Sequence, residues 1–138
     1  DEYRRALERD PHYGVAANNL AWLELERGDA ESAYRLALTA RDAMGERPEV
    51  LHTLGLAYLR KGQPDKAAEV LDTCVRRAPA RTRYRLDLAE ALLEAGQLRE
   101  SERAMAAMTG ALDGEAISRR EAMRRRIADQ RAQEARAH

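Results

Sequence analysis

Three equally spaced glycines constrain the fold of this 138-residue chain more than any other feature. Gly28, Gly62 and Gly96 lie 34 residues apart, and each precedes a polar residue and a run of helix-favouring residues. Small and apolar residues recur in the same phase around them: Leu20-Ala21, Leu54-Gly55 and Leu88-Ala89 before each glycine, and Ala33, Ala67 and Ser101 after it. A sequence that repeats at this interval is typical of stacked units that contact only their neighbours. We therefore predict a repeat array and not a globular enzyme fold.

The middle copy of the repeat predicts two helices joined by a turn. Each helix carries one apolar stripe with helical spacing. The stripes consist of Leu51, Leu54, Gly55 and Tyr58, and then of Ala67, Leu71, Cys74 and Ala78. Gly55 and Ala67 are small, which indicates that the two helix backbones approach closely there. Gly62 suits a left-handed helix end, and Pro64 suits the first turn of the next helix.

The middle copy resembles a tetratricopeptide repeat, a helix-turn-helix unit of 34 residues. The positions that carry the resemblance are Leu51, Leu54-Gly55, Tyr58, Gly62, Ala67, Leu71, Cys74 and Pro79. The departures from the family pattern are Cys74 for alanine in this copy, Ala17 and Glu24 in the first copy, and Arg85 and Leu92 in the third. The resemblance implies an all-α fold, an α-solenoid of stacked helix-turn-helix units with a C-terminal capping helix.

The phase of the repeat predicts how one domain is divided. Tyr3, Ala6 and Pro11 precede their equivalents in the middle copy by two full periods, whereas the period breaks at Asp113-Gly114. An array also needs a terminal helix with a polar outer face. The expected segments are the second helix of a truncated upstream repeat (1–13), three repeats (14–47, 48–81 and 82–115) and a capping helix (116–138). Further repeats are expected upstream.

Composition limits the environment of the chain. Lysine and arginine total 24, as do aspartate and glutamate, so no net charge draws the chain to nucleic acid or an anionic membrane. No apolar run reaches the length of a membrane span, so we expect no membrane insertion. The single cysteine, Cys74, cannot form an internal disulfide, and we predict an inert buried thiol. A soluble segment of either the cytoplasm or the periplasm is consistent with these features.

No group of residues in the sequence predicts catalysis. His12, His52 and His138 are scattered, with no second ligand at metal-binding spacing, and the glycines form no phosphate-binding loop. We therefore predict a protein that is not an enzyme and that has no catalytic residues, no metal and no cofactor.

The resemblance also implies where a partner binds. In tetratricopeptide-repeat proteins the first helices of successive units line a concave groove that binds peptides or proteins. The equivalent positions here are Val15, Asn18, Trp22, Leu25 and Glu26, then Glu49, His52, Leu56, Leu59 and Arg60, then Arg83, Leu86, Glu90, Leu93 and Glu94. They predict a groove with an apolar floor and a mixed-charge rim. Trp22, the only tryptophan, is either an aromatic anchor for the partner or a filler beside the small Ala17 and Ala21.

The expected function is therefore a protein-protein interaction scaffold. The run NNLAWLELERGD resembles bacterial members of the family, so we expect a fragment of a larger bacterial assembly, secretion or envelope protein. Two alternatives stay open. One is a homo-oligomer that forms through exposed repeat ends. The other is binding of an anionic partner or nucleic acid by the C-terminal helix, where seven arginines exceed four carboxylates; nucleic acid is not favoured, because that helix lacks aromatic residues for base stacking.

Overall fold

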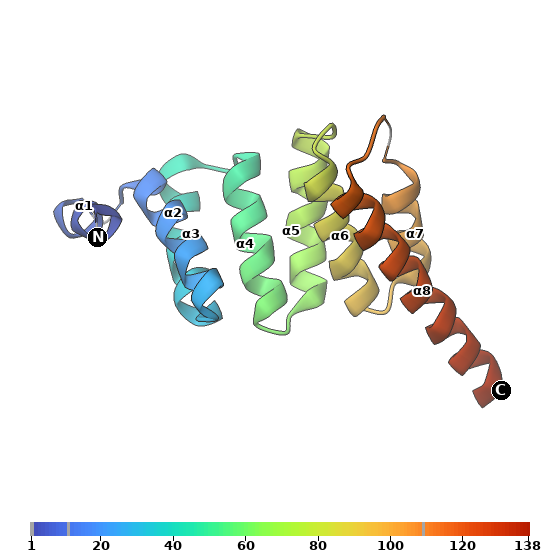
Figure 1. Cartoon of the computed structure of the whole chain (residues 1–138). Helices are drawn as coiled ribbons and strands as arrows, with labels where there is room; N and C mark the ends of the chain where they lie inside the picture. The colour runs from blue at the N-terminus through green and yellow to red at the C-terminus, as the bar shows by residue number, and fades with distance from the viewer. Residues whose placement is uncertain (1, 11, 109) are drawn as a thin grey trace.

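The chain folds into a row of helices. The computed structural model describes residues 2–10, 12–108 and 110–138, and within these ranges it contains eight helices and no strand. The helices are α1 (Glu2–Arg9), α2 (Gly14–Arg27), α3 (Ala30–Met44), α4 (Pro48–Arg60), α5 (Pro64–Arg77), α6 (Thr82–Glu94), α7 (Leu98–Ala106) and α8 (Gly114–Ala137). Helices α2 to α7 stand side by side as three helix-turn-helix pairs (Figure 1). The predicted all-α solenoid is confirmed.

The 34-residue period is visible in the backbone. The first helices of the three pairs begin at Gly14, Pro48 and Thr82. The turns inside the pairs contain Gly28, Gly62 and Gly96, with φ angles of 84°, 75° and 80°. Glycine enters this left-handed region without steric cost, so it ends each first helix and reverses the chain. The spacing of the glycines thus sets the spacing of the helix pairs.

The two helices of the middle pair are in close contact. A Cβ atom added to Gly55 of α4 would lie only 2.5 Å from Cγ of Leu71 on α5. Leu71 and Ala67 of α5 are fully buried. The absence of a side chain at Gly55 therefore makes room for Leu71 and allows this helix crossing.

Cys74 occupies the predicted buried position on α5. Its Sγ donates a hydrogen bond to the carbonyl oxygen of Pro48 over 3.2 Å. Burial, with smaller contributions from the charges of Asp87 and Glu49, raises the pKa of the Cys74 thiol to about 12. The thiol is neutral at physiological pH, and a neutral thiol is a poor nucleophile.

The core follows the array. One cluster of buried residues extends from α4 to α8 and includes Leu51, Leu71, Leu88, Met105 and Ile127. A smaller cluster of Ala17, Ala40 and Val50, with Met44 packed against it, joins α2, α3 and α4. Each pair thus buries its apolar surface against the next pair, as expected for a solenoid. Among the described helices, none combines the length and the apolar character that a membrane span requires.

The last pair is shorter than the other two. Helix α7 has nine residues, whereas its equivalent α5 has fourteen. The chain then runs through Gly110, whose φ angle is 85°, to Asp113, whose side chain accepts a hydrogen bond from the Ala116 amide over 2.8 Å. This N-cap starts α8 at Gly114, two residues before the predicted start of the capping helix.

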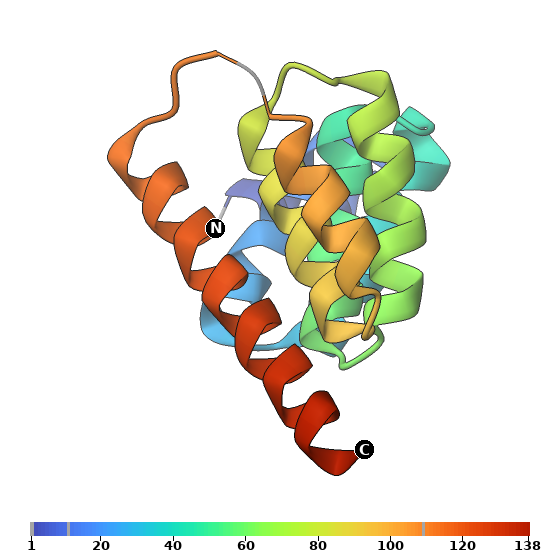
Figure 2. The same cartoon turned by 90° about the vertical axis from the view of Figure 1, so that its right-hand side faces the viewer.

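Helix α8 crosses the array diagonally in front of α6 and α7 (Figure 1). It contacts α6 more extensively than it contacts α7. Three of its residues, Ala116, Met123 and Ile127, are buried in the main core. Almost all residues after Ile127 are exposed, and the helix projects beyond the last pair (Figure 2). The part of α8 up to Ile127 therefore covers the array, and Arg131 adds an ion pair with Glu102 of α7 at the surface.

At the other end, α1 lies across the direction of the upright helices and is seen end-on in Figure 1. Arg4 of α1 donates a hydrogen bond to Glu24 of α2 over 3.2 Å. A helix is thus present in the segment predicted as the second helix of an upstream repeat, but its orientation differs from that of α3 and α5 (Figure 1). Asp1 and Pro11 of this segment lie outside the described residues, and the assignment to a repeat stays a prediction.

The close contact between α4 and α5 leads to a test of stability. We expect Gly55→Ala to lower the free energy of unfolding by about 1–3 kcal/mol, because the added methyl overpacks the crossing at Leu71. Urea denaturation followed by circular dichroism measures this change. Gly114→Ala is the matched control, since a Cβ atom there meets nothing within 4 Å. Equal stability of the two variants would contradict the packing argument.

Candidate partner-binding surface

The predicted binding residues belong to the first helices of the three pairs, α2, α4 and α6. We call the surface that carries these residues the first-helix face. The helices α2 and α4 contact each other directly, as do α4 and α6. Figure 2 shows α8 beside α6, on the side away from α5 and α7. The first-helix face is therefore continuous over three repeats and is covered by α8 at its C-terminal end.

A row of aromatic rings crosses this face from repeat to repeat. The ring centroids of Trp22 and His52 lie 5.5 Å apart, and those of His52 and Tyr84 lie 4.6 Å apart. Both pairs are tilted, by 48° and 42°, a geometry between stacked and edge-to-face. The guanidinium carbon of Arg83 lies 5.2 Å from the centroid of the Trp22 ring, within range of a cation–π contact. Side chains of α2, α4 and α6 are thus in direct contact with one another.

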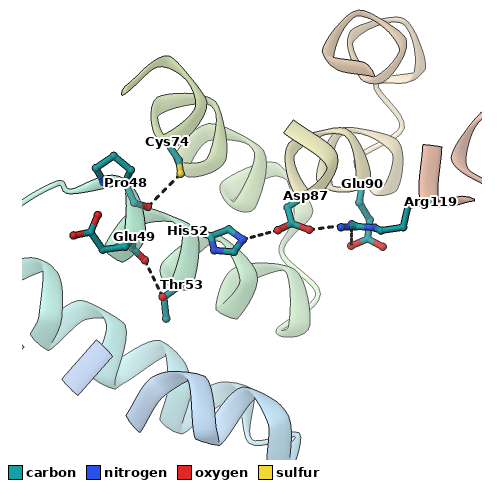
Figure 3. A network of polar contacts seen from close by, with 8 residues as sticks. All are labelled: Pro48, Glu49, His52, Thr53, Cys74, Asp87, Glu90 and Arg119. Carbon is teal, nitrogen blue, oxygen red and sulfur yellow. Dashed lines mark hydrogen bonds and ion pairs between the residues drawn. The ribbon is translucent and has the colours of Figure 1, made fainter. Parts of the chain in front are cut away.

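A buried polar network continues from this row to α8 (Figure 3). Nε2 of His52 lies 2.5 Å from Oδ2 of Asp87, and Oδ1 of Asp87 accepts a hydrogen bond from Nη2 of Arg119 over 2.9 Å. Arg119 also forms an ion pair with Glu90 over 3.8 Å. His52 and Asp87 are only 4% and 5% exposed. The His52–Asp87–Arg119 network therefore links α4, α6 and α8 inside the structure.

The electrostatics of Asp87 follow from its partners. Burial by itself would raise the pKa of this carboxyl, but the hydrogen bond and charge of His52 and the charge and hydrogen bond of Arg119 outweigh burial and lower the pKa. Asp87 is therefore ionised at neutral pH. A buried charge persists only when it is paired and hydrogen-bonded, so the position of Asp87 requires both partners.

The predicted groove residues differ in their exposure. Of the predicted residues, Val15, Glu26, Glu49, Arg60, Arg83 and Glu94 are exposed, and Trp22, Leu25 and Glu90 are partly exposed. Those that are buried are Asn18, His52, Leu56, Leu59, Leu86 and Leu93. The four leucines among them offer little accessible surface, because the first helices pack on one another and α8 contacts α6. The assignment of these positions to a binding site stays a prediction. The accessible part of the face lies mainly over α2 and the start of α4.

Two residues of this region were missed by the sequence analysis. Tyr84 ends the aromatic row, and Asp87 is the centre of the polar network. A signal for Asp87 was present in the repeat: one period earlier stands Thr53, which is fully buried. A carboxylate at a position that another copy buries implies a partner.

Other hollows occur in the structure. A cavity of about 160 Å³ lies between the starts of α6 and α8 and is lined by Thr82, Arg83, Leu86, Asp113, Glu115, Ala116 and Arg119. A groove of about 920 Å³ lies on the side of the second helices of the pairs, with lining residues from α5, α6 and α7 that include Ala68, Val75, Leu88, Leu92 and Ala104.

Within the described ranges, no cluster of three or more histidine, cysteine, aspartate or glutamate residues could hold a metal ion.

Comparison with known proteins agrees with this architecture. The family model described as tetratricopeptide repeat matches residues 58–119. This segment of the chain carries tetratricopeptide repeats. Among curated proteins, no sequence matches it.

Solved structures share the tetratricopeptide-repeat fold along most of the chain. MamA from Desulfovibrio magneticus RS-1 has 15% identity and a TM-score of 0.71, with coverage of 87% of this chain and 63% of MamA. PilF from Pseudomonas aeruginosa has 22% identity and a TM-score of 0.70, with coverage of 99% and 66%. The type III secretion chaperone SycD from Yersinia enterocolitica has 21% identity and a TM-score of 0.69, with coverage of 83% and 92%. The chain thus spans less than two thirds of MamA and of PilF.

The polar network leads to a test that depends on pH. We expect Asp87→Asn to lower the free energy of unfolding by about 2–3 kcal/mol at neutral pH, because it removes the charge that pairs with His52 and Arg119. The lowered pKa of Asp87 means that its stabilisation is present above its unfolded pKa and is lost as the pH falls through its folded pKa. The difference between variant and wild type should therefore shrink below about pH 4.

Chemical denaturation at several pH values measures this difference. Asp72→Asn is the control, since Asp72 forms an exposed ion pair with Arg76 and its loss should change stability little. A constant difference between wild type and Asp87→Asn across this pH range would rule out the stabilising charge.

Proposed function

We propose that this chain is a non-catalytic protein-interaction module that binds a partner protein or peptide on the open part of the first-helix face. The observation that carries the proposal is the setting of Trp22. The residue is partly exposed, and its ring contacts His52 and Arg83 on the face where the tetratricopeptide-repeat resemblance implies binding. Large aromatic side chains in such half-buried positions contribute most of the energy in many protein interfaces.

The contacts of Trp22 favour recognition over gap filling. Ala17, one of the small neighbours that a filler would serve, is buried in a cluster with Ala40 and Val50. The indole instead contacts His52 of α4 and Arg83 of α6. These contacts hold the ring in place and leave part of it accessible, which lowers the entropy cost of binding.

The surroundings of Trp22 suit a segment with mixed chemistry. Val15, which is 47% exposed, lies two helical turns before Trp22 on the same side of α2. Exposed charges of both signs follow at Glu26, Glu49 and Arg83. We infer a partner that places an apolar side chain against Trp22 and Val15 and carries charged groups at the rim.

The solved structures support a role in binding. SycD is a type III secretion chaperone, and its structure was solved in complex with a peptide of the translocator YopD. A fold of this kind therefore binds a peptide in at least one case. We propose by analogy that this chain serves in a bacterial assembly, secretion or envelope protein.

The charges of α8 favour a protein partner over nucleic acid. Four of its seven arginines pair with carboxylates of the chain itself: Arg119 with Asp87, Arg120 and Arg124 with Glu121, and Arg131 with Glu102. Pairing within the chain reduces the positive charge that phosphate groups would meet. We therefore place the binding site on α2 and α4 and not on α8.

A first experiment identifies the partner by crosslinking it at a chosen position on the surface of the chain. A photocrosslinking residue replaces Val15 on the first-helix face or Glu69 on α5, where the side chain is also exposed. We expect one protein to crosslink at position 15 and not at position 69 in extracts of the source cells. The same crosslinks at both positions would contradict a site on the first-helix face.

The second experiment measures the contribution of Trp22 to this complex. We expect Trp22→Ala to weaken binding of the identified partner by at least about 2 kcal/mol, which raises Kd roughly thirtyfold. Isothermal titration calorimetry measures this change. Glu69→Ala should leave Kd unchanged. A folded Trp22→Ala protein with the wild-type Kd would show that the indole only packs.

A further inference from the structure

We propose that α8 is a built-in ligand of the first-helix face, and that the surface of α6 beneath it recognises an amphipathic helix with a basic residue and two apolar residues at positions i, i+4 and i+8. The inference rests on the proposed function and adds a second, helix-specific part to the binding surface. A partner helix with this pattern would occupy the surface when α8 leaves it.

The placement of α8 is that of a bound helix. A helix that only continued the array would pack mainly on the second helix of the last pair, as α4 packs on α3 and α6 on α5. Helix α8 instead packs mainly on α6, and it runs diagonally across the upright helices (Figure 1). This arrangement matches the mode in which an amphipathic helix lies in a groove of its receptor.

One side of α8 makes the contact. Arg119, Met123 and Ile127 follow one another at four-residue intervals, so their side chains lie on one face of the helix. Met123 and Ile127 are 4% and 2% exposed and belong to the main core, and Arg119 reaches Asp87. The other side of the helix carries exposed arginines such as Arg124 and Arg125. The face of α8 that contacts the array therefore carries one basic residue followed by two apolar residues.

Asp87 makes the surface selective for the basic residue. Its Oδ2 is held by His52 inside the array, and its Oδ1 meets Arg119 from α8. A helix with a neutral side chain at this place would leave a buried carboxylate oxygen without its charged partner. Buried polar groups that lose their partner discriminate strongly against the wrong ligand. Glu90, 3.8 Å from the same guanidinium, adds to this preference.

The connection of α8 to the array allows exchange. Ala107 is the C-cap of α7, and Met108 and residues 110–113 form no helix. A cavity of about 160 Å³ also lies between the starts of α6 and α8. A short linker nevertheless gives α8 a local concentration in the millimolar range. A helix in solution therefore competes well only when the contacts of α8 are weakened.

The test uses the full-length chain and a synthetic, fluorescently labelled peptide of residues 114–137. The release variant, Arg119→Ala/Met123→Ala, weakens the chain's own α8 and leaves the surface of α6 intact. The control variant, Arg124→Ala/Arg125→Ala, changes two arginines on the exposed side. Fluorescence anisotropy should show at least tenfold tighter peptide binding to the release variant than to wild type, with the control variant like wild type. A peptide that carries Arg119→Ala should bind the release variant at least tenfold more weakly than the unchanged peptide.

Hydrogen exchange shows whether the release variant behaves as intended. Amides of residues 116–127 should exchange at least tenfold faster than in wild type, whereas those of α4 and α5 should be unchanged. Equal peptide affinity of the three chains despite faster exchange in α8 would overturn the proposal. Unchanged exchange in α8, or equal binding of the two peptides, would also overturn it. These measurements involve neither Trp22 nor the partner found there, so either proposal can fail alone.

Discussion

The structure depends on the close approach of the two helices within each pair. Gly55 leaves room for Leu71 at the crossing of α4 and α5, and small buried residues occupy equivalent places in the other pairs. Because small residues recur every 34 positions, each pair closes in a similar way and stacks on the next in register. The stacking turns α2, α4 and α6 to the same side. Without this register there would be no continuous first-helix face.

The first-helix face is held together by side chains that no single repeat could position. Trp22, His52 and Tyr84 come from three different pairs, yet their rings form one row. The row leads to Asp87, whose buried charge is stable only with partners from α4 and α8. The pairing of the Asp87 charge with Arg119 thus helps to position α8, in addition to the burial of Met123 and Ile127 in the core.

The resulting surface has two parts with different properties. Over α2 and the start of α4 it is accessible, and Trp22 there contacts a histidine and an arginine. Over α6 it is covered by a helix of the same chain. The two parts meet at His52, which contacts Trp22 on one side and Asp87 on the other. His52 is therefore shared by the two parts of the surface.

Local patterns in the sequence predicted the helices, the turns and the buried thiol, because backbone conformation at Gly62 and the spacing of Leu51, Leu54 and Tyr58 depend on residues close in the chain. Exposure of the groove did not follow from such patterns. Leu56, Leu59 and Leu86 have the spacing of an open floor, but the packing of neighbouring first helices and the path of α8 bury them. The partners of Asp87 stand 35 and 32 residues away. Contacts across such distances arise only when the pairs stack, so the tertiary structure alone decides which residues of the face a partner can reach.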